Sequence, residues 1–143
     1  MSRGLDNNNP GNLRRSYDKS GNELFFEGQV PNSTDPSFRQ FTNMGYGYRA
    51  LLKQLQSYVN NGTDTVSSII SKWAPASEND TNTYITDVEN TTGIDRNKQI
   101  SSDDSQSLIS IASAISYHEN GINAIISDVE AGWALLSGKK KLQ

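Results

Sequence analysis

Residues 105–121, SQSLISIASAISYHENG, constrain the fold of this chain more than any other stretch. They predict a helix, and apolar residues wrap most of its circumference: Leu108, Ile111, Ala112, Ala114 and Ile115. The serines and aspartates of residues 101–104 supply a cap at its start, and Gly121 suits the left-handed conformation past its end. A helix that is apolar on most sides is predicted to lie inside a helical domain.

Glu119, in the last turn of this helix, is an unusual placement for an acid. Negative charge is disfavoured at a helix C-terminus, where the macrodipole presents carbonyl oxygens. That field and partial burial favour the protonated carboxylic acid, which is the form that a general acid needs. The alternative is a solvated glutamate beside a turn. Glu119 is therefore a candidate general acid.

The composition limits the class of protein. The 143 residues, 34% hydrophobic and 20% charged, fit one domain with its own core. A net charge of -3 gives no indication of a nucleic-acid-binding surface. Cysteine is absent and His118 is the only histidine, so thiolate and multi-histidine metal sites are excluded and no cofactor is predicted. The polar N-terminus and the lack of a long apolar stretch predict neither a signal peptide nor membrane insertion, and we expect a monomer.

Residues 1–44 are predicted to form an N-terminal loop and a small β element. Residues 1–12 have no apolar periodicity, and NNNPGN at residues 7–12 specifies a tight turn. A turn signal at residues 18–22 precedes a strand pattern at residues 23–27, and FRQF at residues 38–41 is assigned to another strand. An antiparallel hairpin or a three-stranded sheet is expected.

Residues 45–138 are predicted to be helical, and residues 139–143 to form a basic tail. Besides residues 105–121, four apolar patterns at helical spacing are present: residues 48–59, 66–73, 84–88 and 122–136. Trp73 and Trp133 lie on these apolar stripes, so they are assigned to the core rather than to sugar stacking. The prediction is a single domain, residues 1–143, of the α+β class and mostly α.

Several motifs together resemble a family of phage and prophage proteins that are often described as virion structural proteins. They are NNNPGN at residues 7–12, DPSFRQF at 35–41, GYRALLKQL at 47–55, KWAPASENDTNTY at 72–84 and HENG at 118–121. The resemblance covers nearly the whole chain and implies association with a virion and with other virion proteins. It does not imply a chemistry.

A second resemblance, to enzymes that cleave glycans, implies a chemistry. Glucosaminidases and lytic transglycosylases of the lysozyme superfamily carry a helix that ends in a catalytic glutamate, a small residue and glycine, and SAISYHENG at residues 113–121 is similar, with Asn120 where serine is usual. Their Asn-Asn-x-x-Gly loop resembles residues 8–11, their Phe-Arg-x-Tyr strand resembles residues 38–41, and their acidic-polar turn with a following tyrosine resembles residues 78–81 and Tyr84. The resemblance implies a lysozyme-like helical domain with a β-hairpin.

The order of these motifs differs from that of the familiar enzymes, in which the glutamate helix precedes the Asn-rich loop. A circular permutation reconciles the two orders, because the termini of compact domains often lie close together. This hypothesis places Glu119, Tyr84 and the hairpin around one groove.

The resemblance implies the following site. The catalytic candidates are Glu119, Tyr84 and Glu78, and the substrate-binding candidates are Asn8, Asn9, Asn12, Glu27, Phe41, His118 and Asn120. A second carboxylate stays open between Glu27, Asp35 and Glu78, and a lytic transglycosylase needs none. Each candidate has a structural alternative: Tyr84 as a core residue, His118 as a helix-end residue, and Arg14, Arg15 and Arg39 as solvated cations instead of contacts to an anionic glycan.

The sequence therefore predicts a phage-associated enzyme that cleaves the β-1,4 backbone of peptidoglycan with Glu119 as general acid. It would act in the virion or in the bacterial periplasm and cell wall. The alternatives are a non-catalytic virion component or glycan-binding module, and an effector delivered to a rival bacterium. Hydrolysis and transglycosylation are both open.

Overall fold

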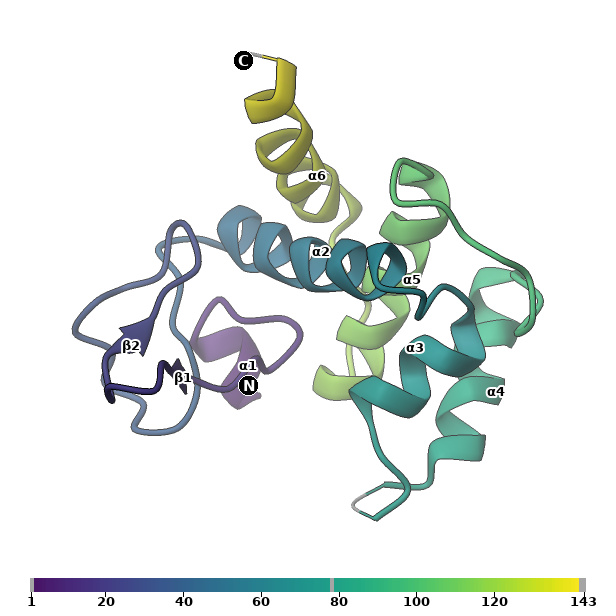
Figure 1. Cartoon of the computed structure of the whole chain (residues 1–143), viewed down its shortest axis with the longest axis horizontal. Helices are drawn as coiled ribbons and strands as arrows, with labels where there is room; N and C mark the ends of the chain where they lie inside the picture. Colours follow the sequence, from purple (N-terminus) through teal and green to yellow (C-terminus); the bar gives the residue numbers. More distant parts are fainter. Residues whose placement is uncertain (1, 78, 142–143) are drawn as a thin grey trace.

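The structure is mostly helical, with a small two-stranded antiparallel sheet near the N-terminus (Figure 1). This computed structural model describes residues 2–77 and 79–141. The elements follow in the order α1 Arg3–Asp6, β1 Ser16–Tyr17, β2 Glu23–Leu24, α2 Met44–Asn60, α3 Val66–Trp73, α4 Thr81–Thr92, α5 Ser105–Asn120 and α6 Ile126–Lys141. The predicted α+β class is confirmed.

α5 is the buried helix that its sequence predicts. Leu108 and Ile115 are fully buried in the main core. The Asp104 carboxylate caps the N-terminus by accepting a hydrogen bond from the Ser107 backbone N–H at 3.1 Å. Gly121 ends the helix with a φ of 77°, in the left-handed region that favours glycine.

α2 connects the two parts of the molecule. Figure 1 shows it running from the β region on the left to α3, α4 and α5 on the right. Leu51 and Leu55 on α2 belong to the main core, which the other long helices share. Ala50 belongs instead to a smaller core with Leu13 and Phe41 from the N-terminal part. One amphipathic helix therefore fixes both parts of the chain to each other.

The hairpin forms around the turn predicted at residues 18–22, with Ser16 opposite Leu24. The Asp18 carboxylate accepts hydrogen bonds from the backbone N–H groups of Ser20 and Asn22, both at 2.9 Å. This side-chain pattern is what makes aspartate a turn former.

Two predictions for the N-terminal part are wrong. Residues 3–6 form α1, where a continuous loop was expected, because Ser2 caps this turn by accepting a hydrogen bond from the Leu5 N–H at 3.2 Å. Residues 38–41 form no strand and make only isolated bridges at Phe38 and Phe41. The Asp35 carboxylate accepts the hydrogen bond of the Phe38 N–H, so this donor is not free for a regular ladder.

The last helix begins later than the apolar pattern. Ile122 and Ile125, predicted to belong to it, lie in the connection after Gly121 and are 56% and 65% exposed. α6 packs on α2 through Val129 and Leu136 and continues through Lys141, so it includes part of the predicted basic tail. Residues 142–143 of that tail lie outside the described residues. Among the described helices, none has the length and apolar character to cross a membrane.

Candidate functional site

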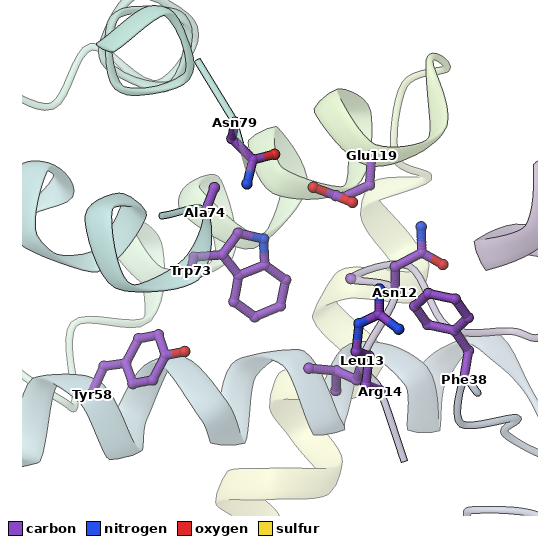
Figure 2. Close-up of a pocket in the computed structure, with 10 residues that line it drawn as sticks. Asn12, Leu13, Arg14, Phe38, Tyr58, Trp73, Ala74, Asn79 and Glu119 are labelled. Carbon is purple, nitrogen blue, oxygen red and sulfur yellow. The ribbon is translucent and has the colours of Figure 1, made fainter. Parts of the chain in front are cut away.

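A cleft separates the N-terminal turn from the helical core and contains Glu119 (Figure 2). Its volume is about 320 Å³, within the range of small-molecule sites. The lining residues come from the N-terminal turn, the connection between β2 and α2, α2, α3, the loop after α3 and the end of α5: Gly11, Asn12, Leu13, Arg14, Phe38, Tyr58, Trp73, Ala74, Asn79 and Glu119.

The Glu119 carboxylate is half-buried and contacts Tyr84. The Tyr84 hydroxyl donates a hydrogen bond to Glu119 Oε2 at 3.0 Å. Tyr84 is 1% exposed, so burial, followed by the neighbouring Glu119 charge, raises the pKa of its hydroxyl far above the usual value. The Trp73 indole interacts with the same hydroxyl and lowers its pKa, which only partly offsets the effect of burial. Tyr84 is therefore a neutral hydrogen-bond donor that orients Glu119.

Aromatic side chains surround this pair. Trp73 packs against both hydrophobic cores, as its assignment to the core predicts, and it also lines the cleft, which that assignment did not include. The His118 ring stacks on the Tyr84 ring, with centroids 3.6 Å apart, from the exposed side of α5. His118 does not line the cleft with Glu119, but it covers the tyrosine that contacts Glu119.

The Asn-rich turn forms the opposite wall. Asn12 lines the cleft, adopts a left-handed φ of 52°, and carries a buried Oδ1 without a hydrogen-bond partner among the described residues. Asn9 is fully buried, and its amide donates to the carbonyls of Leu13 and Arg39 at 3.0 and 2.8 Å. Asn8 donates to the Phe41 carbonyl at 3.1 Å. Of these three asparagines, only Asn12 lines the cleft with Glu119.

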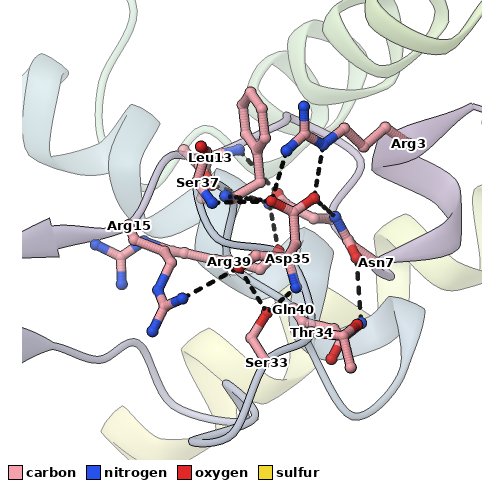
Figure 3. Close-up of polar contacts among 12 residues, drawn as sticks. Arg3, Asn7, Leu13, Arg15, Ser33, Thr34, Asp35, Ser37, Arg39 and Gln40 are labelled. Carbon is pink, nitrogen blue, oxygen red and sulfur yellow. Dashed lines mark hydrogen bonds and ion pairs between the residues drawn. The ribbon is translucent and has the colours of Figure 1, made fainter.

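Asp35 holds this wall in place (Figure 3). Its carboxylate accepts hydrogen bonds from Arg3 Nε and Nη2 at 2.6 and 2.7 Å and from the Asn7 amide at 3.0 Å. The backbone N–H groups of Ser37 and Phe38 donate to it as well, both at 2.9 Å. The Arg3 guanidinium, together with these donors, holds the pKa of Asp35 well below its usual range. Asp35 is engaged in structure and does not line the cleft.

The remaining predicted residues lie elsewhere. Glu27 forms an ion pair with Arg49 on α2 at 2.9 Å, and Phe41, 2% exposed, belongs to the smaller core. Asn120 connects α5 to the N-terminal segment through hydrogen bonds instead of lining the cleft. Glu78 lies outside the described residues.

The permutation hypothesis places Glu119, Tyr84 and the hairpin around one groove, and the structure agrees with it only in the contact between Tyr84 and Glu119. No residue of β1 or β2 lines the cleft, and residues 11–14 and Phe38 take that place. Sequence reasoning missed Phe38, Tyr58 and Asn79 as lining residues. Phe38 had a signal, because it opens the motif at residues 38–41. Within the described part of the chain, no three His, Asp or Glu side chains form a metal-binding group.

A comparison with known proteins identifies a phage relative. The chain is 38% identical to protein P5 of Pseudoalteromonas phage PM2 over 127 residues, which cover 88% of this chain and 76% of that protein. The chain belongs to the family of phage protein P5. The predicted kinship with phage proteins is thus confirmed at the level of the family.

Membership in the P5 family leaves the chemistry of the cleft open, because the name of the relative states none. No protein-family model matches the chain. The resemblance to the lysozyme superfamily, and with it the glycosidase activity, stays a prediction.

Proposed function

We propose that this P5-family protein cleaves the β-1,4 glycan backbone of peptidoglycan, with Glu119 as general acid. The observation that carries the proposal is the position of Glu119: a half-buried carboxylate in a cleft, in contact with the buried Tyr84 hydroxyl. The kinship with a phage protein supports a role at the bacterial cell wall during infection or release.

The cleft suits a sugar chain. Trp73 offers an apolar ring to the cleft, and Asn12 and Asn79 offer amide groups beside it. Binding sites for organic ligands combine apolar walls with a few placed polar groups, and sugars present the same mixture of apolar ring faces and hydroxyls. The Asn12 side chain lies on the cleft wall, and Figure 2 shows its amide nitrogen turned toward Glu119.

The number of carboxylates favours transglycosylation over hydrolysis. Two-carboxylate glycosidases place an acid and a second carboxylate on either side of the bond. Glu119 is the only carboxylate among the described lining residues, and Asp35 and Glu27 are held by arginines elsewhere. In the proposed reaction Glu119 protonates the leaving oxygen. The sugar's own C6 hydroxyl then attacks the anomeric carbon and returns a proton to Glu119, which yields an anhydro-sugar end.

The test is digestion of purified peptidoglycan by the wild-type protein and by Glu119→Gln, with mass analysis of the soluble products. We expect anhydro ends from the wild type and a loss of at least about a hundredfold in rate for the variant, the lower end of general acid catalysis. Glu130→Gln, which removes an exposed carboxylate from α6, is the matched control and should be fully active. Reducing ends would indicate hydrolysis, and equal rates for wild type and Glu119→Gln would refute the mechanism.

A second candidate is a non-catalytic glycan-binding component of the phage particle. The lack of a second carboxylate among the described lining residues favours it, because the aromatic and amide side chains are sufficient for binding. It predicts that wild type and Glu119→Gln bind peptidoglycan equally and that neither releases products.

A further inference from the structure

Arg14 differs from the other arginines of the chain. Those others donate hydrogen bonds or form ion pairs: Arg3 with Asp35, Arg15 with Glu23, Arg39 with Gln29, Arg49 with Glu27 and Arg96 with Glu89. The Arg14 guanidinium has no hydrogen bond and no ion pair within the described chain, and its only recorded contact is with the Phe38 ring. A guanidinium carries its N–H donors in a planar fork. The N–H donors of Arg14 therefore have no acceptor within the described chain.

The ring contact fixes the orientation of Arg14. Its guanidinium carbon lies 4.7 Å from the centroid of Phe38, and the Arg3 guanidinium carbon lies 4.4 Å from the same centroid. Arg3 is held by Asp35, which also accepts the hydrogen bond of the Phe38 N–H. Stacking occupies the face of a guanidinium and leaves its N–H edges free, so Arg14 is oriented before any ligand arrives.

Arg14 lines the same cleft as Glu119, on the wall formed by the N-terminal turn (Figure 2). It is the only cationic side chain among the described lining residues, and it forms no ion pair with Glu119. A planar fork of free donors matches the two oxygens of a carboxylate. A neutral sugar chain offers no such group.

We propose that Arg14 binds a carboxylate of the substrate, so that the cleft selects an acidic glycan over a neutral one. This inference rests on the proposed function and gives it a substrate class. In peptidoglycan the carboxylate belongs either to the lactyl group of the sugar or to the stem peptide. Both present the same chemistry to Arg14.

The test measures binding in the Glu119→Gln background, so that turnover does not interfere. The ligands are peptide-bearing glycan fragments, peptide-free fragments with lactyl carboxylates, the same fragments after carbodiimide amidation, and neutral N-acetylglucosamine oligomers. We expect the carboxylated fragments to bind about tenfold more tightly than the amidated and neutral ones, the difference that one charge-assisted hydrogen bond supplies. If the peptide-free fragments are preferred, Arg14 binds the lactyl carboxylate. If the preference requires the peptide, Arg14 binds a carboxylate of the stem peptide.

Adding Arg14→Gln should remove this preference, so that carboxylated and amidated fragments bind equally. Arg14→Lys should keep little of it, because an ammonium lacks the planar fork. Lys53→Gln, an exposed cation on α2, is the matched control and should keep the preference. A preference that persists in Arg14→Gln overturns the inference and leaves the proposed function standing. Equal binding of all four ligands also overturns it. If none of the four ligands binds, both proposals are overturned.

Discussion

At the scale of single residues, the contact between Tyr84 and Glu119 links the core to the cleft. Tyr84 is nearly fully buried, and its hydroxyl is the only part that reaches the carboxylate. Burial raises the pKa of this hydroxyl, so it is neutral and able to donate a hydrogen bond at neutral pH. Its role in the proposed reaction is to position Glu119.

Tyr84→Phe removes this donor and keeps the ring that packs in the core. We expect a loss of about 1 kcal/mol in unfolding free energy, measured in urea, together with slower release of peptidoglycan fragments. Tyr48→Phe is the matched control, because the buried Tyr48 hydroxyl donates to Ser116 Oγ at 2.8 Å and does not line the cleft. It should lose similar stability and keep its activity. Equal activity losses in both variants would show that Tyr84 acts through stability alone.

Asp35 gives a prediction about pH. Its carboxylate is held ionised by Arg3 and the backbone donors, and its pKa in the folded protein lies well below the unfolded value of about 4. As the pH falls below about 4, the unfolded chain takes up a proton before the folded chain does. The stability that Asp35 contributes is therefore fully present at neutral pH and is lost progressively below about pH 4.

Asp35→Asn should lose about 2–3 kcal/mol at pH 7, because the charge-assisted hydrogen bonds are weakened. Its stability should also depend less on pH between about pH 4 and 2 than that of the wild type, as measured by urea unfolding at a series of pH values. Asp87→Asn, an exposed position on α4, should follow the wild-type curve. An unchanged slope for Asp35→Asn would mean that Arg3 does not hold this carboxylate in solution.

At the scale of elements, the packing of α6 on α2 depends on a glycine. A Cβ at Gly132 would lie 2.7 Å from the Arg49 backbone nitrogen and 2.7 Å from Tyr48 Cβ. Neither neighbour is a flexible side-chain end, so the helices must separate to accommodate a methyl group. A Cβ at Gly138, on the same helix, meets nothing within 4 Å.

Gly132→Ala should therefore destabilise the protein by about 1–3 kcal/mol. Gly138→Ala is the matched control and should stabilise it by up to about 1 kcal/mol, because alanine is the better helix former. Thermal unfolding of the two variants beside the wild type gives both values. Stabilisation by both substitutions would show that α6 does not pack closely on α2.

The sequence predicted the long helices well because caps and apolar periodicity are local signals. Asp104 and Gly121 mark the ends of α5 in the sequence and in the structure. The N-terminal part was harder, because side-chain hydrogen bonds replace its backbone ladder. Asp35 reaches Arg3 and Asn7, and no periodicity encodes contacts of that kind.

Of the candidate site, only the residues that lie in recognisable sequence motifs could be predicted. Glu119 stood out by its position in a helix end, and Tyr84 by its resemblance to a tyrosine after an acidic turn. Arg14 and Phe38 line the cleft with Glu119 because the fold brings distant segments together, which no local sequence pattern encodes. Phe41, a predicted substrate-binding residue, is instead buried in the smaller core.

At the scale of the whole molecule, the cleft exists only while the N-terminal segment stays against the end of α5. Besides the packing on α2, Asn120 makes this connection. Its Oδ1 accepts a hydrogen bond from Ser2 Oγ at 2.7 Å, and its Nδ2 donates to the Pro10 carbonyl at 2.9 Å. Nδ2 also donates to the Ser116 carbonyl within α5, at 2.9 Å. One amide next to Glu119 thus holds both ends of the N-terminal segment.

Asn120→Ala should release this segment without unfolding the core. We expect amide hydrogen exchange to accelerate in residues 3–12 and to stay slow in α2 and α4, since local opening requires only the free energy of the contacts that it breaks. Peptidoglycan cleavage should fall as well, because the wall opposite Glu119 is no longer fixed. Asn120→Ser should behave like alanine, because a serine hydroxyl cannot reach both Ser2 and the Pro10 carbonyl. Asn61→Ala, which removes an amide that donates to the Ser57 carbonyl at 2.8 Å on the exposed end of α2, should change neither property. Exchange that accelerates uniformly over the whole chain would show that Asn120 supports global stability and not the cleft, and that the two parts of the molecule unfold as one.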